Sequence, residues 1–297
     1  AKHLDSLGES YRLLDAAAMG ELTGVDYYRG GLWTPGAAML QPALYIRGLA
    51  AGLQAHPEFS LYEDSPVTAL ERSTDGWRAT TPGGVVRASK VILAVNGMLE
   101  RFGYHQRRLM HVFTYASMTR ALSEDECRRL GGSERHWAFT PADPMGTTVR
   151  RIAGMGGDRI VVRNRFTYDP SMVIPGGRLG SVAMAHRRAF RERFPMLDGV
   201  EMEYCWGGRL CLSLNGVSTV GKVAEGVYSA CCQNGLGTAR GTLSGILAAE
   251  RACGTTESLV PGYAAEDKPR RLWPEPLMWL GANGYLRWKE WRAGREF

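Results

Sequence analysis

The 297-residue sequence has no apolar run long enough to cross a bilayer and no dense cluster of basic residues. Its longest near-apolar stretches, Val91–Val95 and Gly245–Ala249, fall far short of the roughly 20 residues that a membrane helix needs. The excess of 36 basic over 30 acidic residues gives a net charge of only +6, spread along the chain. The sequence therefore predicts no membrane span and gives little support to nucleic-acid binding.

The six cysteines form no Cys-x-x-Cys pair and have no closely spaced histidine partners. Structural zinc is usually held by cysteine and histidine at short spacings, so we expect no metal site. A disulfide framework is not expected in a chain of this length either. We therefore expect most of the cysteines to be small buried apolar side chains in a reducing, cytoplasmic compartment.

What the sequence does contain is an ordinary globular composition, with 44% hydrophobic and 22% charged residues. Its length suits one large domain or two intermediate ones. Helical spacing of apolar residues predicts three early helices: Leu4–Leu14, Ala16–Leu22 after the cap Asp15, and Pro42–Ala55. Strand patterns occupy Tyr27–Trp33, Phe59–Glu63, Val67–Arg72, Trp77–Thr81, Val85–Arg87 and Lys90–Val95. The last of these is continuously apolar, as is typical of a strand buried on both faces.

From about residue 110 to residue 204 the pattern changes to alternating strands and amphipathic helices. Strands are expected at His111–Arg120, Thr147–Ala153 and Arg159–Arg163, with a glycine-rich hairpin turn at Gly154–Asp158. Ser123 and Glu126 form a capping box for a short helix ending at Leu130. A basic amphipathic helix covers Ala183–Phe194 and stops at Pro195. This stretch predicts an antiparallel sheet with helices on one side, inserted into the first domain as a second one.

The most informative pattern is a strand, a glycine turn and a helix near the end of the chain. The strand is Gly226–Cys231, the turn is Cys232–Gly237, and the helix is Thr238–Ala252, which is rich in small residues. The free N–H groups and the dipole of a helix N-terminus favour negative charge, and glycine lets a ligand come close. Such turns also serve purely structural purposes, so the pattern by itself leaves both interpretations open.

Four sequence blocks in order resemble one enzyme family. The blocks are Tyr28–Leu32 with Gln41–Tyr45, then Val91–Gly97, then Trp206–Leu210, then Gly226–Tyr228 continuing through Gly235–Gly237 to Gly245. Together they resemble the FAD-dependent amine and amino-acid oxidases of the D-amino-acid oxidase superfamily, most closely the γ-glutamylputrescine oxidase, glycine oxidase and sarcosine oxidase type. The resemblance spans residue 1 to about residue 255.

The resemblance implies FAD as the cofactor and suggests which residues contact it. In that family the strand end at Ala94–Gly97 lies beside the dinucleotide, backbone near Val67 meets the adenine end, and the glycine turn meets the flavin pyrimidine ring. The implied cofactor-binding residues are Val67, Ala94, Asn96, Gly97, Asn234, Gly235, Leu236, Gly237 and Thr238. A helix N-terminus at the pyrimidine ring would stabilise the negative charge that reduced flavin develops there.

The resemblance also suggests residues on the substrate side, each with a plainer alternative. Arg209 is a candidate for binding a substrate carboxylate, since a guanidinium suits that group, or else it forms a structural salt bridge. Tyr28, Tyr45 and Tyr115 either line the pocket or belong to the core. His111 either acts as a base or only packs. Some family members hold flavin through a cysteine, and Cys211 falls in a comparable neighbourhood although its surrounding sequence matches poorly.

The chain departs from the family at its amino end. The family carries a G-x-G-x-x-G turn in an N-terminal βαβ unit, and this chain, which opens with Ala1, has no such turn before residue 28. Gly154–Gly157 falls in the predicted hairpin and opens no helix. We therefore expect the strand Lys90–Val95 to lack its parallel partner and to expose a sheet edge. These residues alone should bind FAD weakly, with a partner chain or a missing N-terminal segment completing the site.

The predicted fold class is α/β plus α+β: a discontinuous, Rossmann-like FAD-binding domain with an inserted antiparallel-sheet substrate domain. The substrate domain is expected at 1–40 and 111–204, the FAD-binding domain at 41–110 and 205–260, and an aromatic and basic tail at 261–297. Aromatic and basic residues together favour either docking of the tail on its own domain or contact with a membrane surface or nucleic acid.

The predicted function is oxidation of the CH–NH bond of a small amine or amino acid to an imine. Dioxygen or a carrier would then reoxidise the flavin, which supplies the chemistry while the protein orients the reactants. The alternative is a non-catalytic remnant or interaction subunit of the same fold that binds no flavin unaided.

Overall fold

The computed structural model describes residues 1–255, 258 and 267–297, and it divides into two compact units. Unit 1 comprises Ala1–Met39, Phe113–Gly208 and Leu280–Phe297, and unit 2 comprises Leu40–Val112 and Arg209–Trp279. None of the described helices is long and apolar enough to cross a membrane. The predicted boundary between residues 260 and 261 lies outside the described residues. Assignment of the units to substrate and flavin binding stays a prediction.

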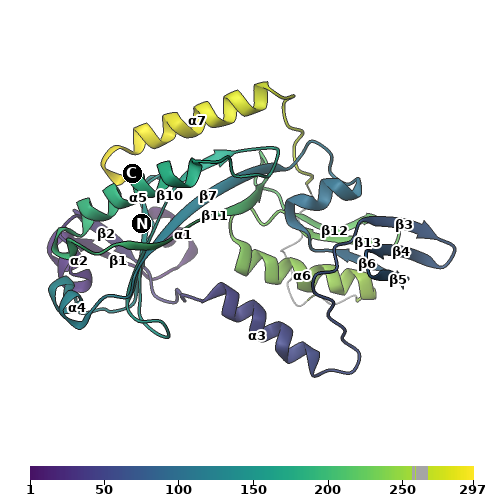
Figure 1. Cartoon of the computed structure of the whole chain (residues 1–297), viewed down its shortest axis with the longest axis horizontal. Helices are drawn as coiled ribbons and strands as arrows, with labels where there is room; N and C mark the ends of the chain where they lie inside the picture. Colours follow the sequence, from purple (N-terminus) through teal and green to yellow (C-terminus); the bar gives the residue numbers. More distant parts are fainter. Residues whose placement is uncertain (256–257, 259–266) are drawn as a thin grey trace. The chain divides into compact units, whose positions relative to one another are not determined.

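Unit 1 is built on a five-stranded sheet in the order β11-β7-β10-β9-β8 (Figure 1). The strands are β7 (Met110–Thr119), β8 (Trp137–Phe139), β9 (Thr148–Ile152), β10 (Arg159–Tyr168) and β11 (Met202–Leu212). β9 pairs antiparallel with both β8 and β10, and Val149 lies opposite Val162. The predicted hairpin around Gly154–Asp158 is therefore confirmed, with a longer second strand than expected.

Helix α5 (Arg178–Arg193) packs against this sheet and begins five residues before the predicted start. Its end contributes Phe190 and Phe194, whose rings stack 5.1 Å apart, to the main core of unit 1. His186 of the same helix is fully buried, and its Nδ1 lies 2.7 Å from the hydroxyl of Ser117 in β7. Burial lowers the pKa of His186 to about 4, so the imidazole is neutral at physiological pH. A short 3₁₀ turn, Pro195–Leu197, follows the helix.

The first residues of unit 1 form a helix and a strand where one longer helix was predicted. Helix α1 (Lys2–Leu7) ends where Gly8 adopts a left-handed conformation with φ 67°, and Arg12–Asp15 then form strand β1. β1 pairs antiparallel with β2 (Gly30–Trp33), and the Arg12 guanidinium lies 4.4 Å from the centre of the Trp33 ring. The predicted helix Leu4–Leu14 is therefore wrong beyond Leu7, because cross-strand pairing overrides the local helical spacing.

Helix α2 (Ala16–Thr23) follows the prediction closely. The Asp15 carboxylate accepts a hydrogen bond of 2.9 Å from the backbone N–H of Ala18, as an N-cap residue does. The helix ends at Gly24, which has a φ of 74°. An added side chain at Gly24 would collide with backbone atoms of Leu130 and Gly131, so glycine is required there both by conformation and by close packing.

Unit 2 contains a three-stranded sheet in the order β12-β13-β6, with helix α6 packed on it (Figure 1). The elements are β6 (Val91–Leu93), β12 (Thr219–Ala224), β13 (Val227–Cys231) and α6 (Gly237–Cys253). β6 runs parallel to β13, with Val91 opposite Val227. β13 is the one strand paired with β6 in the described chain, and β6 lies at the edge of this sheet, so the expected unpaired sheet edge is present. The expected burial of both faces is wrong, because Leu93 is buried whereas Ile92, on the other face, is 41% exposed.

A second sheet in unit 2 is the predicted meander, formed by β3 (Ala69–Ser73), β4 (Gly76–Thr81) and β5 (Gly84–Ala88). Neighbouring strands are antiparallel. The Trp77 indole donates a 3.0 Å hydrogen bond to the carbonyl of Glu225, which ties the meander to the turn before β13. The segment Phe59–Glu63, predicted as a strand, forms none.

Four further helical segments occur in the described chain. Helix α3 (Pro42–Gln54) has proline at its first position and a Gln41 side chain that accepts from the N–H of Ala43, as predicted for its start. A 3₁₀ helix, η1 (Asn96–Phe102), follows β6. Helix α7 (Leu277–Ala293) and a final 3₁₀ turn, Gly294–Glu296, form the described part of the tail.

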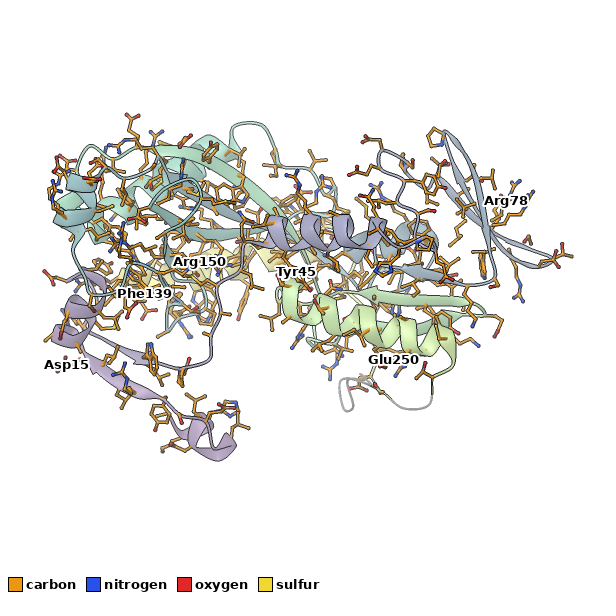
Figure 2. All side chains as sticks on the ribbon, turned by 90° about the horizontal axis from the view of Figure 1, so that it is seen from below. Asp15, Tyr45, Arg78, Phe139, Arg150 and Glu250 are labelled. Atoms are coloured by element: carbon orange, nitrogen blue, oxygen red, sulfur yellow. The ribbon has the colours of Figure 1, made fainter. Side chains whose placement is uncertain are left out.

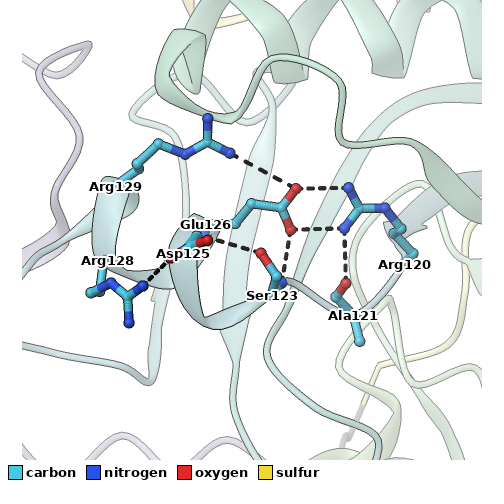
Figure 3. A network of polar contacts seen from close by, with 7 residues as sticks. All are labelled: Arg120, Ala121, Ser123, Asp125, Glu126, Arg128 and Arg129. Carbon is cyan, nitrogen blue, oxygen red and sulfur yellow. Dashed lines mark hydrogen bonds and ion pairs between the residues drawn. The ribbon is translucent and has the colours of Figure 1, made fainter.

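Helix α4 (Glu124–Leu130) begins with the predicted capping box, which belongs to a wider charge network (Figure 3). The Ser123 hydroxyl and the Glu126 carboxylate each bond the backbone N–H of the other residue. The Arg120 guanidinium donates two further hydrogen bonds to Glu126, of 2.7 and 2.8 Å. Arg129 lies 3.9 Å away on the other side of the carboxylate. Hydrogen bonds from Arg120 and Ser123 outweigh burial and lower the pKa of Glu126 to about 2.

We predict that Glu126→Gln destabilises the protein at pH 7 and that the difference disappears in acid. Because the pKa of Glu126 is about 2 when folded and near its usual value of 4.5 when unfolded, the stabilisation is present above pH 4.5. It is lost as the pH falls toward 2. We expect about 1–2 kcal/mol at pH 7, since Arg120 is half exposed to screening solvent. Urea unfolding across this pH range measures it, with the exposed Glu124→Gln as the control. A difference that persists at pH 2 would contradict the assignment.

Candidate functional site

Two turns lie at one edge of the unit 2 sheet because β6 and β13 are parallel and their carboxyl ends coincide. Asn96 follows β6 and has a φ of 49°, and Cys232 follows β13 with a φ of 59°. The Asn96 side-chain oxygen accepts a 3.2 Å hydrogen bond from the backbone N–H of Cys232, which joins the two turns. In open α/β sheets, ligands bind at this end of the strands.

The Asn234 side chain fixes the shape of the second turn. Its carbonyl oxygen accepts a 2.8 Å hydrogen bond from the N–H of Ser213. Its amide group donates to the carbonyls of Gly216, at 3.0 Å, and Cys232, at 3.1 Å. Asn234 also has a positive φ of 52°, which asparagine tolerates better than most residues. The predicted cofactor residue Asn234 therefore holds the turn through its side chain.

The turn leads into the N-terminus of α6, which no side chain caps. The cap residue is Leu236, an exposed side chain that accepts no hydrogen bond, and Thr238 lies in the first turn of the helix. An added side-chain carbon at Gly235 or Gly237 would meet no atom within 4 Å, so the space in front of these glycines is open. The first N–H groups of a helix have no partner within it and carry partial positive charge. This end of α6 can therefore accept an electron-rich group.

Gly97 lies at the base of the first turn, in close contact with His111 and Cys211. A side-chain carbon added to Gly97 would be 2.7 Å from Nδ1 of His111 and 3.6 Å from the Cys211 side chain. The other ring nitrogen of His111 lies 3.4 Å from the Glu100 carboxylate, and both side chains are largely buried. Burial favours the neutral carboxyl, but hydrogen bonds from His111 and from the Arg108 backbone N–H lower the pKa of Glu100.

Three of the six cysteines gather beneath the two turns, in the core of unit 2. Cys211, Cys231 and Cys232 are buried, whereas Cys127 and Cys205 are half-buried and Cys253 is exposed. A hydrogen bond with Cys232, followed by burial, raises the pKa of Cys211, which keeps its thiol protonated. The expectation of mostly buried cysteines therefore holds for half of them.

The structure places two substrate-side candidates in unit 2. Arg209, in β11, is exposed and has no ion-pair partner among the described residues. The alternative of a structural salt bridge is thus not seen in the part of the chain that the structure describes. The Tyr45 hydroxyl of α3 lies 3.3 Å from the hydroxyl of Thr242 in α6. Figure 2 shows Tyr45 beside α6. Val67 and Ala94 are exposed.

The other two tyrosines belong to unit 1, where Tyr115 is buried and Tyr28 is half-buried. The Tyr115 hydroxyl bonds Thr167 at 2.7 Å, and its ring is fully buried in the sheet. Tyr28 packs edge-on against Phe139 with ring centres 4.5 Å apart, and burial raises the pKa of Tyr28 to about 12. Of the two alternatives for Tyr28, the structure supports packing against the core of unit 1. A contact between Tyr115 and substrate stays a prediction.

A hollow in unit 1 has a volume of about 780 Å³ and holds none of the predicted site residues. Three of its charged lining residues are paired with one another: the Asp158 carboxylate lies 2.5 Å from Arg135 and 4.0 Å from Arg151. It also accepts a hydrogen bond of 3.1 Å from the Cys127 thiol. The Asp158 carboxylate in this hollow is therefore already paired with neighbouring side chains.

Sequence reasoning missed the groups that support the two turns. Glu100 and Ser213 were not singled out, although they bond His111 and Asn234. No local pattern marks such partners, because they come from other elements of the fold. One signal was available: Cys211 directly follows the block Trp206–Leu210, and Ser213 lies two residues further along.

We predict that Gly97→Ala destabilises the protein by about 1–3 kcal/mol, because the added methyl group must displace the His111 ring. Gly48→Ala, in α3, is the matched control, since nothing lies within 4 Å there and alanine favours a helix. Urea unfolding measures both. Adding His111→Ala to the Gly97 variant should recover part of the loss, and strictly additive effects would exclude this contact.

Comparisons with known proteins identify the family of the chain. The family model described as DAO, FAD dependent oxidoreductase, matches residues 1–251. The chain is 23% identical over 258 residues to a probable oxidoreductase, OrdL, of Haemophilus influenzae, covering 84% of this chain and 56% of that protein. It is 26% identical over 247 residues to the gamma-glutamylputrescine oxidoreductase of Escherichia coli, covering 82% and 55%. The chain thus spans about half the length of these curated relatives.

Solved structures show the same fold. Glycine oxidase from Geobacillus kaustophilus aligns with a TM-score of 0.70 at 19% identity, over 90% of this chain and 70% of that one. NikD, an amino acid oxidase of nikkomycin biosynthesis, aligns in its open form with a TM-score of 0.65 at 19% identity, over 92% and 72%. With most of its length matched by the family model, the chain belongs to the DAO family of FAD-dependent oxidoreductases.

Proposed function

We propose that the protein oxidises the CH–NH bond of a small amine or amino acid to an imine, with FAD as its cofactor. Family membership supports the cofactor and the reaction class. The names of similar proteins support the substrate class, since they include a gamma-glutamylputrescine oxidoreductase and a glycine oxidase. The observation that carries the proposal is the open, uncapped N-terminus of α6 at the carboxyl ends of two parallel strands.

The residues of this edge fit one end of a flavin. The open space before Gly235 and Gly237 admits a flat ring, and the first N–H groups of α6 match the carbonyl and N1 acceptors of a pyrimidine. When bound, FAD would supply the redox chemistry, namely removal of a hydride from the carbon that bears the amine and transfer of the electrons to dioxygen or a carrier. The protein's part is to place positive partial charge where the reduced ring would be negative.

Other residues would keep this edge in shape. Asn96 ties the first turn to Cys232, and Asn234 anchors the second turn to Ser213 and Gly216. Val67 and Ala94 are exposed and would contact the rest of the dinucleotide. We propose that its pyrophosphate is held by a segment outside these 297 residues, on the same polypeptide or on a partner chain, since phosphate needs a glycine-rich helix start of its own.

Arg209 would bind the carboxylate of an amino-acid substrate. Its guanidinium is exposed, belongs to the same unit as the α6 turn, and has no ion-pair partner in the described chain. A planar guanidinium donates two parallel hydrogen bonds to a carboxylate, which orients the substrate as well as attracting it. Tyr45, which belongs to the same unit, would supply an aromatic contact on the substrate side. Arg209 therefore favours an amino acid over a plain amine.

The turn assignment is tested with Gly237→Val. A branched side chain should fill the open space at the start of α6, so we expect FAD to bind at least tenfold more weakly. The control is Gly180→Val, which changes a glycine in the first turn of α5 where nothing lies within 4 Å either. Titration of the whole gene product with FAD, followed by flavin absorbance, measures both. Equal affinity in the two variants would refute the assignment.

The substrate assignment is tested with Arg209→Gln. Loss of a charge-assisted, bidentate contact should raise KM for an amino-acid substrate about tenfold to a hundredfold, with kcat changed by less than about threefold. An amine substrate without a carboxylate serves as the control, since its KM should stay unchanged. If KM rises equally for both substrates, Arg209 acts through the fold and does not bind the carboxylate.

A further inference from the structure

Helix α7 turns its polar side chains toward the protein. Asn283 bonds the backbone of Tyr168 twice, donating to its carbonyl at 3.0 Å and accepting from its N–H at 3.1 Å. Arg287 donates to the carbonyl of Phe166, and Glu290 accepts from the N–H of that residue at 3.3 Å. These polar residues occupy the face that is normally apolar in a helix packed on a globular protein.

The reason lies in strand β10. Its pairing with β9 covers only Arg159–Arg163, so the strand continues beyond the end of its neighbour. The backbone groups of Phe166 and Tyr168 need hydrogen-bond partners, and the polar side chains of α7 provide them. Glu290 is buried between Arg287, at 2.6 Å, and Arg165, at 3.6 Å, so the inward charges are paired. The polar side chains Asn283, Arg287 and Glu290 of α7 therefore all bond residues of unit 1.

Another side of α7 carries a stripe of large apolar side chains that are exposed. It is made of Leu280, Tyr285, Trp288 and Trp291, the last three of which recur every three residues. All four are exposed, from 48% for Trp288 to 78% for Trp291. The Tyr285 and Trp288 rings lie 5.8 Å apart, and the Arg292 guanidinium lies 5.3 Å from the Trp288 ring. Contiguous exposed apolar side chains of this kind mark an interaction surface.

The charges around the stripe are positive. In residues 280–297, Arg292 and Arg295 are exposed, whereas Glu290 is buried and Glu296 accepts from the Asp143 N–H. The whole chain carries a net charge of +6. Tryptophan and tyrosine prefer the boundary between lipid headgroups and acyl chains, and arginine can keep its apolar stem in that layer and its charge in the headgroups.

We propose that α7 lies in the surface of an anionic lipid bilayer, with the stripe in the headgroup layer and Arg292 paired with lipid phosphates. The charge favours lipid over a second copy of the chain, because two copies of this face would bring the exposed Arg292 side chains together, whereas anionic headgroups complement them. A single helix face suits interfacial binding, which adds apolar insertion to electrostatic attraction. The chain would be held at the surface without crossing it.

The test is sedimentation of the whole protein with phosphatidylcholine vesicles, with and without phosphatidylglycerol. We expect binding to the mixed vesicles, little to the neutral ones, and weaker binding at high salt because charge contributes. Binding should shift the tryptophan emission to shorter wavelength. Trp288→Ser with Trp291→Ser should lower the bound fraction about tenfold or more, and Arg292→Glu should remove most of the preference for phosphatidylglycerol.

The control variant is Trp33→Ser with Tyr62→Ser, which removes two exposed aromatics elsewhere and should bind like the parent protein. Circular dichroism checks that α7 stays folded, as its polar contacts predict. Absence of binding to every vesicle, or equal binding by the parent and the stripe variant, overturns the proposal. Light scattering without lipid supplies a further outcome. A dimer that the stripe variant converts to monomer would show that a second copy occupies this face, and that result also overturns it.

Discussion

The parallel pairing of β6 with β13 is the constraint on which the candidate site depends. It joins Val91 to Val227, two residues far apart in the chain, and so places the turns that follow both strands at the same edge of one sheet. The Asn96 side chain then bonds the backbone of the second turn. Without this register, the distance between the N-terminus of α6 and Gly97 would not be fixed. The geometry of the proposed flavin contact follows from three residue pairs in a short sheet.

Close packing beneath this edge limits what the turns can do. Gly97 leaves no room for a side chain against His111, and the thiols of Cys211 and Cys232 fill the space between the turns and the core. Asn234 uses both ends of its amide on backbone partners. On one side of the site the polar groups of Asn234 are all hydrogen-bonded within the protein. On the other side, the space in front of Gly235 and Gly237 is open. A ligand can approach this edge from the open side.

Sequence reasoning succeeded where a structure is specified by neighbouring residues. Asp15, Pro42 and the Ser123–Glu126 pair each act within one helical turn, and the structure has helices beginning at these positions. It failed at Leu4–Leu14, where apolar spacing suits a helix but pairing with Gly30–Trp33 makes part of the segment a strand. The glycine turn before α6 was found from its pattern. The hydrogen bonds from Asn234 to Ser213 and Gly216 were not, since they depend on tertiary contacts.

The side chains of α7 that bond Phe166 and Tyr168 have a second consequence, for association between chains. A strand that extends beyond the end of its neighbour has unpaired N–H and C=O groups along one side. Such groups can pair with a strand of another molecule. Here those groups are occupied by an amide, a carboxylate and a guanidinium, none of which can continue a ladder. The side chains of α7 therefore take the place of a neighbouring strand along this part of β10. They prevent a strand of another molecule from pairing there.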